Sequence, residues 1–260
     1  IYKKFHFVDI HGENKIHKFT KISAGGIFST FFLNLFIFQA CLNFPLNASP
    51  RIWLLPILFL LFYITAIMDF FRGVPAVVRL VIYVTLSYIS LSALPHPLEP
   101  EFLNHTPKIL VAFIVYYLIF FINVTNFSDG IDGNLFIMVL SICLSLLFLD
   151  LHFTYLQDLQ AILLLLLVSY FLAHLFFNLH PSKMFLSDIG TIPISFLLGW
   201  IILSFAKFEY LAAVFILPMY YFVDIGLTLL IRIFKKKNIF VRHNTFFFQR
   251  MINSLNYSNY

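Results

Sequence analysis

Residues 160–177 read QAILLLLLVSYFLAHLFF, an apolar stretch without a single Asp, Glu, Lys or Arg. A helix needs about 20 mostly apolar residues to cross the hydrocarbon core of a bilayer. Similar stretches recur along the chain, and they predict about eight transmembrane helices, near residues 27–44, 51–68, 76–94, 107–122, 135–149, 160–177, 189–206 and 210–233. We therefore expect an all-α fold, a polytopic integral membrane helical bundle.

The composition excludes the classes of protein that fold in water. Hydrophobic residues make up 61% of the 260 residues and charged residues only 11%, against roughly 45–50% and about 25% in soluble domains. Such a chain has too little polar surface to cover a globule in water, and it is too apolar to stay disordered. Cys41 and Cys143 lie within apolar stretches, which favours packing over a disulfide. We expect residues 1–260 to form a single transmembrane domain.

The basic residues predict which side of the membrane each loop faces. An alternating path through eight spans places all but three of the 17 Lys and Arg residues on one side, the exceptions being Arg51, Lys108 and Lys207. Cytoplasmic loops carry the excess of Lys and Arg in membrane proteins, so that side is assigned to the cytoplasm. The run KKK at residues 235–237 fits a topology signal or a lipid-headgroup contact. A substrate-phosphate site is the alternative for this run, and nucleic-acid binding is not expected.

Several aspartates fall where a charged side chain is costly. At or just inside the predicted cytoplasmic ends of apolar stretches lie Asp69, Asp129, Asp132, Asp188 and Asp224. Acids in membrane segments usually face a cavity and have a function, so the set predicts an active site on the cytoplasmic face. For any single acid, a solvated helix end is the alternative. A transporter with an intramembrane acidic site is disfavoured, because a transport site lies near the membrane midplane.

The segment NVTNFSDGIDGN, residues 123–134, separates two predicted spans. Asn123, Asn126 and Asp129 recur every three residues, so they would line one side of a helix end. Their oxygens suit Mg²⁺, which binds few protein ligands and keeps positions for water and phosphates. The alternative is a structural role in which Ser128 or Asp129 caps the next helix.

A second polar segment, FNLHPSKMFLSDIGTIP at residues 177–193, places Lys183 and Asp188 at the start of another span. A helix N-terminus with an acid, a nearby lysine and a glycine can hold a metal-bound phosphate. The alternative is that Ser187 or Asp188 only caps this helix.

These motifs resemble ordered blocks of the polyprenyl-phosphate N-acetylhexosamine-1-phosphate transferases of glycosyltransferase family 4. NVTNFSDGIDG is similar to the family's NxxNxxDGxDG block, and FNLHPSKMFLSDIGT to its FNxxPAKxFMGDxGS block. DFFRGVPAVVRL, residues 69–80, resembles the aspartate-pair block, and GENKIHKFTKISAGGI and LPMYYFVDIGLTLLIRI resemble an early and a late block. The resemblance spans residues 9–255 and is closer to enzymes that start O-antigen chains than to phospho-MurNAc-pentapeptide translocase.

The resemblance implies a Mg²⁺-dependent enzyme that transfers an N-acetylhexosamine-1-phosphate from a UDP-sugar to undecaprenyl or another polyprenyl phosphate. UMP is released, and the product is the first membrane intermediate of a cell-envelope glycan. The implied metal ligands are Asp188 and Asn126. The implied cofactor-binding and nucleotide-site residues further include Asp129, Asp132 and Lys183.

The resemblance also implies which residues act on the phosphates. Asp69 would assist the lipid phosphate, as a base or as a covalent nucleophile. Asp188 would be essential to turnover through the metal, and Arg79 and His243 would contact phosphate groups.

The implied partners are a UDP-N-acetylhexosamine, a polyprenyl phosphate lipid and the membrane, with a homodimer left open. The implied location is the bacterial inner membrane, as a multi-pass protein. Family members have a helix before the first block and usually more chain after the late histidines, so the chain is expected to be truncated at both ends.

Two positions depart from the family pattern. Phe70 stands where the family has the second aspartate of its pair, and Phe246 where it commonly has the second histidine of a late HxxH block. An alternative is therefore a member that binds nucleotide-sugar or polyprenyl phosphate without turning it over.

Overall fold

The computed structural model describes residues 8–9, 21–22, 24–43, 51–94, 107–153, 158–205, 211–238 and 245–254. This part of the chain is almost entirely helical. Its helices are α1 (Gly26–Asn43), α2 (Leu54–Arg72), α3 (Ala76–Ser90), the 3-10 turn η1 (Leu91–Ala93), α5 (Lys108–Ser128), α6 (Asn134–Phe153), α7 (Asp158–Asn178), α8 (Ser187–Ser204), α9 (Leu211–Ile216), α10 (Met219–Phe234) and α11 (Phe247–Ser254). Strands β1 (Val8–Asp9) and β2 (Lys21–Ile22) form one short antiparallel pair.

The described chain contains seven helical segments that are long and apolar enough to cross a membrane. They are α1, α2, α3 with η1, α5, α6, α7 and α8. Large apolar side chains such as Phe28, Ile109 and Phe176 are exposed on the outside of the bundle. Because helices satisfy their own backbone hydrogen bonds, they are suited to the hydrocarbon core of a membrane. The expected fold class is confirmed: the chain is a multi-pass helical membrane bundle.

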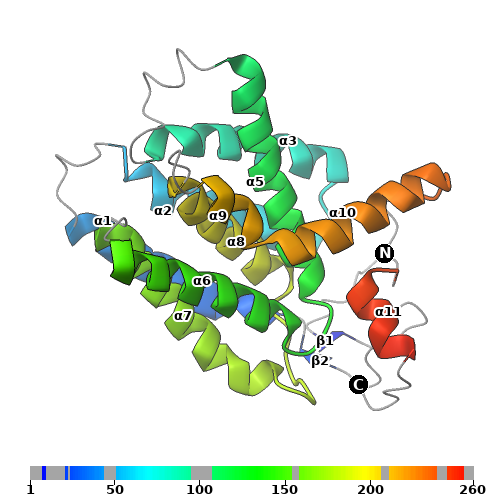
Figure 1. Ribbon diagram of the computed structural model, residues 1–260. Coiled ribbons are helices and arrows are strands. Elements are labelled where there is room, and N and C mark those ends of the chain that lie inside the picture. Colours follow the sequence, from blue (N-terminus) through cyan, green and yellow to red (C-terminus); the bar gives the residue numbers. More distant parts are fainter. Residues whose placement is uncertain are drawn as a thin grey trace.

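Helix α8 is the centre of the bundle. In α8, 83% of the span is buried, compared with 33–44% in the other six spans. It packs against α1, α2 and α5 (Figure 1). A Cβ on Gly199 would lie 2.6 Å from Leu118 Cδ1 of α5, so glycine permits the close approach of these two helices. Any polar group at the start of α8 is thereby surrounded by several other helices.

The eighth predicted helix, 210–233, is not one continuous span, and this prediction is wrong. The segment is broken into the six-residue α9 and the longer α10, with Pro218 between them. Proline lacks a backbone N–H and its ring clashes with the preceding turn of a helix, so a helix can end at a proline even where the apolar run continues. Beyond the break, α10 packs against α5 and α11, and its far end projects outward from the bundle (Figure 1).

The chain segments that carry most of the predicted site residues meet at one end of the bundle. The connections α2–α3, α5–α6 and α7–α8 meet there with the segment before α1, because successive spans run in opposite directions. A Cβ on Gly26 of α1 would lie 2.7 Å from the Gly190 nitrogen of α8. Next to this contact, Ile22 N donates to Lys183 O at 3.0 Å and Phe185 N to Ile22 O at 2.9 Å. The N-termini of α1 and α8 are thus joined backbone to backbone.

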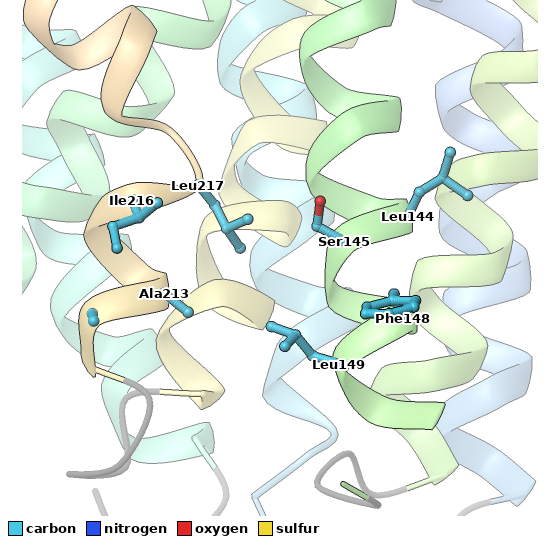
Figure 2. Close-up of a pocket in the computed structure, with 8 residues that line it drawn as sticks. Leu144, Ser145, Phe148, Leu149, Ala213, Ile216 and Leu217 are labelled. Atoms are coloured by element: carbon cyan, nitrogen blue, oxygen red, sulfur yellow. The ribbon is translucent and has the colours of Figure 1, made fainter. Parts of the chain in front are cut away.

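An open cavity of about 620 Å³ lies between α6 and the α9 segment. Figure 2 shows its lining of apolar side chains, including Leu144, Phe148 and Leu149 of α6 and Ile216 of α9, with Ser145 as a polar exception. These α6 residues belong to the half of the helix remote from Asn134, where the α5–α6 connection ends. The cavity is therefore separate from the predicted site acids, which lie at the other end of α6.

Candidate functional site

Asp69, Arg79 and Asp188 come together from three helices. Gly73, with φ of 70°, ends α2, and the short turn that follows leads into α3. This reversal lets Arg79 Nη1 donate to Asp69 Oδ2, while the same nitrogen lies 3.7 Å from Asp188 Oδ2 of α8. The backbone N–H of Val74 donates to Asp69 Oδ1 at 2.8 Å and fixes that carboxylate. We call these three side chains the acid–arginine cluster.

The acid–arginine cluster is accessible from outside the protein. The exposed fractions of the side chains are 40% for Asp188, 30% for Arg79 and 16% for Asp69. Two carboxylates share one guanidinium, so the cluster carries an excess negative charge when both acids are ionised. A cation placed against Asp188 would balance that charge, and the guanidinium can attract an anion.

Asn126, at the end of α5, extends the acid–arginine cluster. Its amide interacts with the Asp188 carboxylate, to which only the amide N–H can donate, and its Oδ1 accepts a hydrogen bond from Thr191 Oγ1. Asp188 and Thr191 lie one turn apart on α8, so both face this side chain. Within the described residues, no three His, Cys, Asp or Glu side chains gather as a preformed metal centre. The nearest oxygen donors are the Asp188 carboxylate and Asn126 Oδ1, which Thr191 Oγ1 occupies in this structure, and carboxylate and amide oxygens are ligands that suit a metal retaining several waters.

Asp129 stabilises the start of α8 from another element. Its Oδ2 accepts the backbone N–H of Ser187 at 2.8 Å, across 58 residues of chain. Ser187 has a φ of 55°, and the capping position before it, Leu186, provides no side-chain hydrogen bond to the helix. Carboxylates at helix N-termini satisfy free N–H groups and interact favourably with the helix dipole. Asp129 therefore orients the first turn of α8, where Asp188 lies.

For residues 123–134 and 177–193, the alternative interpretation was that a serine or an aspartate caps the helix that follows. The structure contradicts this interpretation for both segments. Helix α6 begins at Asn134, and Ser128 Oγ donates back to the Val124 carbonyl of α5 at 3.0 Å. Neither Ser187 nor Asp188 is the cap of α8, because that helix already includes both.

Asp132 holds the α7–α8 connection. Its Oδ1 accepts Ser182 Oγ at 2.7 Å, and its Oδ2 accepts Ser182 N at 2.9 Å and faces His180 Nδ1 at 3.2 Å. The Asp132 side chain is only 4% exposed. Charged groups that accept several hydrogen bonds contribute more to stability than exposed ion pairs do. In this structure the hydrogen bonds of the Asp132 carboxylate are made to residues of the α7–α8 connection.

Comparisons with known proteins show the family of the chain. A family model described as glycosyl transferase family 4 matches residues 52–206, more than half of the chain. The chain belongs to glycosyl transferase family 4. A phospho-N-acetylmuramoyl-pentapeptide-transferase of Dictyoglomus thermophilum is 30% identical over 157 residues, which cover 56% of this chain and 48% of the relative. The chain thus spans about half the length of this curated relative.

The family 4 match includes most of the predicted site. Within residues 52–206 lie Asp69, Arg79, Asn126, Asp129, Asp132, Lys183 and Asp188. The structure places Lys183 on the exposed connection before α8. His243 lies outside the described residues, so its predicted phosphate contact stays a prediction.

The two departures from the family pattern are both packed as aromatic residues. Phe70 lies edge-on to Phe71, with ring centroids 5.2 Å apart, beside the acid–arginine cluster. Phe246 is buried, and its ring stacks on Phe127 of α5 and on Phe248, at 5.6 Å in each case. In this family member Phe246 therefore serves to attach α11 to the bundle.

Asp224, the last of the five predicted acids, lies outside the acid–arginine cluster and has a structural role. Its two carboxylate oxygens accept the backbone N–H groups of Phe247 at 2.8 Å and Phe248 at 3.2 Å. These are the first two residues of α11. Asp224 therefore caps α11 from α10 and does not join the acid–arginine cluster.

The sequence analysis missed Asn178 as an organising residue. Asn178 is buried, its Oδ1 accepts Gly133 N at 2.8 Å, and its Nδ2 donates to Met184 O at 2.7 Å. It thereby ties the α5–α6 turn to the α7–α8 connection. An amide at the end of a long apolar run was the available signal, because a buried polar group needs hydrogen-bond partners.

Proposed function

We propose that this chain transfers an N-acetylhexosamine-1-phosphate from a UDP-sugar to a polyprenyl phosphate and releases UMP. The observation that carries the proposal is the acid–arginine cluster, which gathers two acids and one cation at the end of a membrane bundle of this family. The name of the D. thermophilum relative, a phospho-sugar transferase, supports the same class of reaction. We further propose that the site faces the cytoplasm of a bacterial inner membrane, where a UDP-sugar is available.

Asp188 and Asn126 are proposed to hold Mg²⁺. The fit is supported by their oxygen chemistry, by the proximity of the two side chains and by the 40% exposure of Asp188. When bound, the metal neutralises charge on the pyrophosphate of the donor.

The remaining cluster residues act on the phosphates. Arg79 can turn its guanidinium from the carboxylates to a phosphate group, where it stabilises the charge of the transition state. Asp69, fixed by the Val74 N–H, is proposed to assist the lipid phosphate by accepting its proton. An oxygen of the lipid phosphate then bonds to the phosphorus that carries the sugar, while the bond from this phosphorus to the UMP oxygen breaks. Such a transfer depends mainly on positioning and electrostatics.

Asp129 and Asp132 are proposed to form the nucleotide site indirectly. Both carboxylates bind backbone N–H groups of the α7–α8 connection and the start of α8. They would therefore shape the walls of the pocket, and the exposed Lys183 on the same connection would provide a cation for a phosphate.

The test is an assay of membranes that contain the full-length protein with undecaprenyl phosphate, Mg²⁺ and a panel of donors. The donors are UDP-GlcNAc, UDP-GalNAc and UDP-MurNAc-pentapeptide, with UMP release and the lipid product followed by mass spectrometry. We expect one donor to give a lipid-linked sugar phosphate that is lost with EDTA. Absence of product with every donor would contradict the proposal.

A second candidate is binding without turnover, which the aromatic packing of Phe70 and Phe246 favours. The same assay separates the two functions, because this candidate predicts donor binding with no UMP. In that case, Phe70→Asp combined with Phe246→His should raise activity.

A further inference from the structure

The hydroxyl of Tyr83 is buried and has no structural role among the described residues. Tyr83 is 6% exposed, and its hydroxyl has no hydrogen-bond partner among the described residues. Buried polar atoms are normally paired, because leaving one unpaired forfeits its hydrogen bonds with water. The position of this hydroxyl therefore calls for a partner that the ligand-free chain lacks.

Other buried tyrosines of the bundle have partners. Tyr117 is 4% exposed, and its hydroxyl donates to the Val214 carbonyl at 2.7 Å. The hydroxyl of Tyr170 lies 3.0 Å from Ser29 Oγ and 3.1 Å from Thr30 Oγ1. These hydroxyls join helices to one another, which the Tyr83 hydroxyl does not do.

Tyr83 lies directly beneath the acid–arginine cluster. It follows Arg79 by one turn of α3, so both side chains are on the same face of the helix. Its ring packs on Phe62 of α2, at 5.5 Å between centroids, and Phe62 stacks on Phe196 of α8 at 4.5 Å. Asp188 lies about two turns before Phe196 on α8, and Asp188, Arg79 and Asp69 all act electrostatically on Tyr83. The aromatic stack is thus the apolar floor of the site, and Tyr83 occupies the boundary with its charged groups.

We propose that Tyr83 is a positioning residue for Asp188 once a phosphate ligand is bound. This inference rests on the proposed function. In the ligand-free chain, the longer contact of Arg79, 3.7 Å, is the one to Asp188. A bound phosphate competes for the guanidinium and draws it from that carboxylate. The Tyr83 hydroxyl would then donate to one carboxylate oxygen of Asp188. The second oxygen of that carboxylate would thereby stay available to the metal.

The experiment compares Tyr83→Phe with Tyr117→Phe in the purified full-length protein. Mn²⁺ binding is followed by electron paramagnetic resonance in detergent with saturating UDP-GlcNAc, after subtraction of the same titration without protein. Tyr83→Phe should raise the Mn²⁺ dissociation constant about tenfold, because one hydrogen bond to a charged group is lost. Its melting temperature should not fall, since the ligand-free hydroxyl stabilises nothing. Tyr117→Phe should do the reverse, with a lower melting temperature and unchanged Mn²⁺ affinity.

A second pair of variants tests the donor without relying on an aromatic ring. Tyr83→Gln retains a hydrogen-bond donor, and Tyr83→Met has a similar length without one. We expect tighter Mn²⁺ binding in Tyr83→Gln than in Tyr83→Met. Equal affinity in this pair, or wild-type affinity in Tyr83→Phe, would overturn the inference.

Failure of the proposed function gives a different result from failure of this inference. Mn²⁺ binding that depends on Tyr83 but leads to no UMP release would contradict the transferase reaction and support the role of Tyr83. UMP release by wild type with unchanged Mn²⁺ affinity in Tyr83→Phe would do the opposite. A wild type that binds no Mn²⁺ would overturn both the metal site and the inference.

Discussion

Carboxylates in two neighbouring regions of this bundle are treated in opposite ways. In the acid–arginine cluster, Asp188 is 40% exposed, and the two acids share one guanidinium. In the adjoining connections, Asp129 and Asp132 are largely buried and accept backbone N–H groups at 2.8–2.9 Å. The same residue type is thus left open to a ligand in the region where we propose the site, and it is a structural anchor in the other. The two regions differ in the shared guanidinium of Arg79 and in the exposure of Asp188, because Asp69 of the cluster also accepts a backbone N–H, that of Val74.

The largest expected effect is on turnover, from Asp188→Asn. This change removes the charge that would hold the metal and should lower UMP release at least about a hundredfold, while the protein stays folded. The matched control is Asp150→Asn, the same change near the far end of α6. Turnover of Asp188→Asn near the wild-type rate would remove Asp188 from the proposed metal site.

The next effect is on stability, from Asp132→Asn. An amide can accept fewer hydrogen bonds than a carboxylate, so the bonds from Ser182 and His180 are weakened and the free energy of unfolding should fall by about 2 kcal/mol. Thermal unfolding in detergent measures the change. An unchanged melting temperature would contradict the structural role that distinguishes Asp132 from the acids of the acid–arginine cluster.

A smaller loss of stability is expected from Gly26→Ala. The added Cβ would lie 2.7 Å from the Gly190 nitrogen and would push the N-termini of α1 and α8 apart. We expect a loss of about 1–2 kcal/mol, as for other overpacked sites. Gly130→Ala is the control, because the nearest atom to its added Cβ is 3.8 Å away. Equal melting temperatures for these two variants would contradict the close contact of α1 with α8.

The smallest effect is expected from Phe70→Asp. If Asp69, Arg79 and Asp188 suffice for the reaction, a second acid should change turnover by less than about threefold. The initial rate of UMP release measures this change. A much larger rise would show that Phe70 restrains the enzyme and would favour binding without efficient turnover in the natural chain.

Much of the fold could be predicted from the sequence because lipid imposes one requirement on every span. A segment in hydrocarbon must bond its own backbone, so long apolar runs predict helices. The segment around Pro218 was the exception, since its hydropathy continues while the helix is interrupted between Ile216 and Met219.

The candidate site was predictable only where a motif contains residue types that indicate a particular chemistry, such as metal or phosphate binding. The aspartates at predicted helix ends and the blocks around Asn126 and Asp188 indicated one site, and the resemblance of residues 69–80 to a family block added Arg79. The partners of Asp129 and Asp132 were not predictable, because they lie 48 to 58 residues away and include backbone N–H groups, which have no sequence signature. Tyr83 gave no signal either, since a tyrosine in an apolar run is typical of core packing.

The central claim is that the acid–arginine cluster binds the ligand and that Asp132 holds the fold. It is tested most directly by melting temperatures in detergent, with and without Mg²⁺ and UDP-GlcNAc, for wild type, Asp188→Asn and Asp132→Asn. A ligand that binds the folded state raises its melting temperature. We predict that ligand stabilises wild type and Asp132→Asn, the latter from a lower starting value, and leaves Asp188→Asn unchanged. Stabilisation of Asp188→Asn equal to that of wild type would contradict the account.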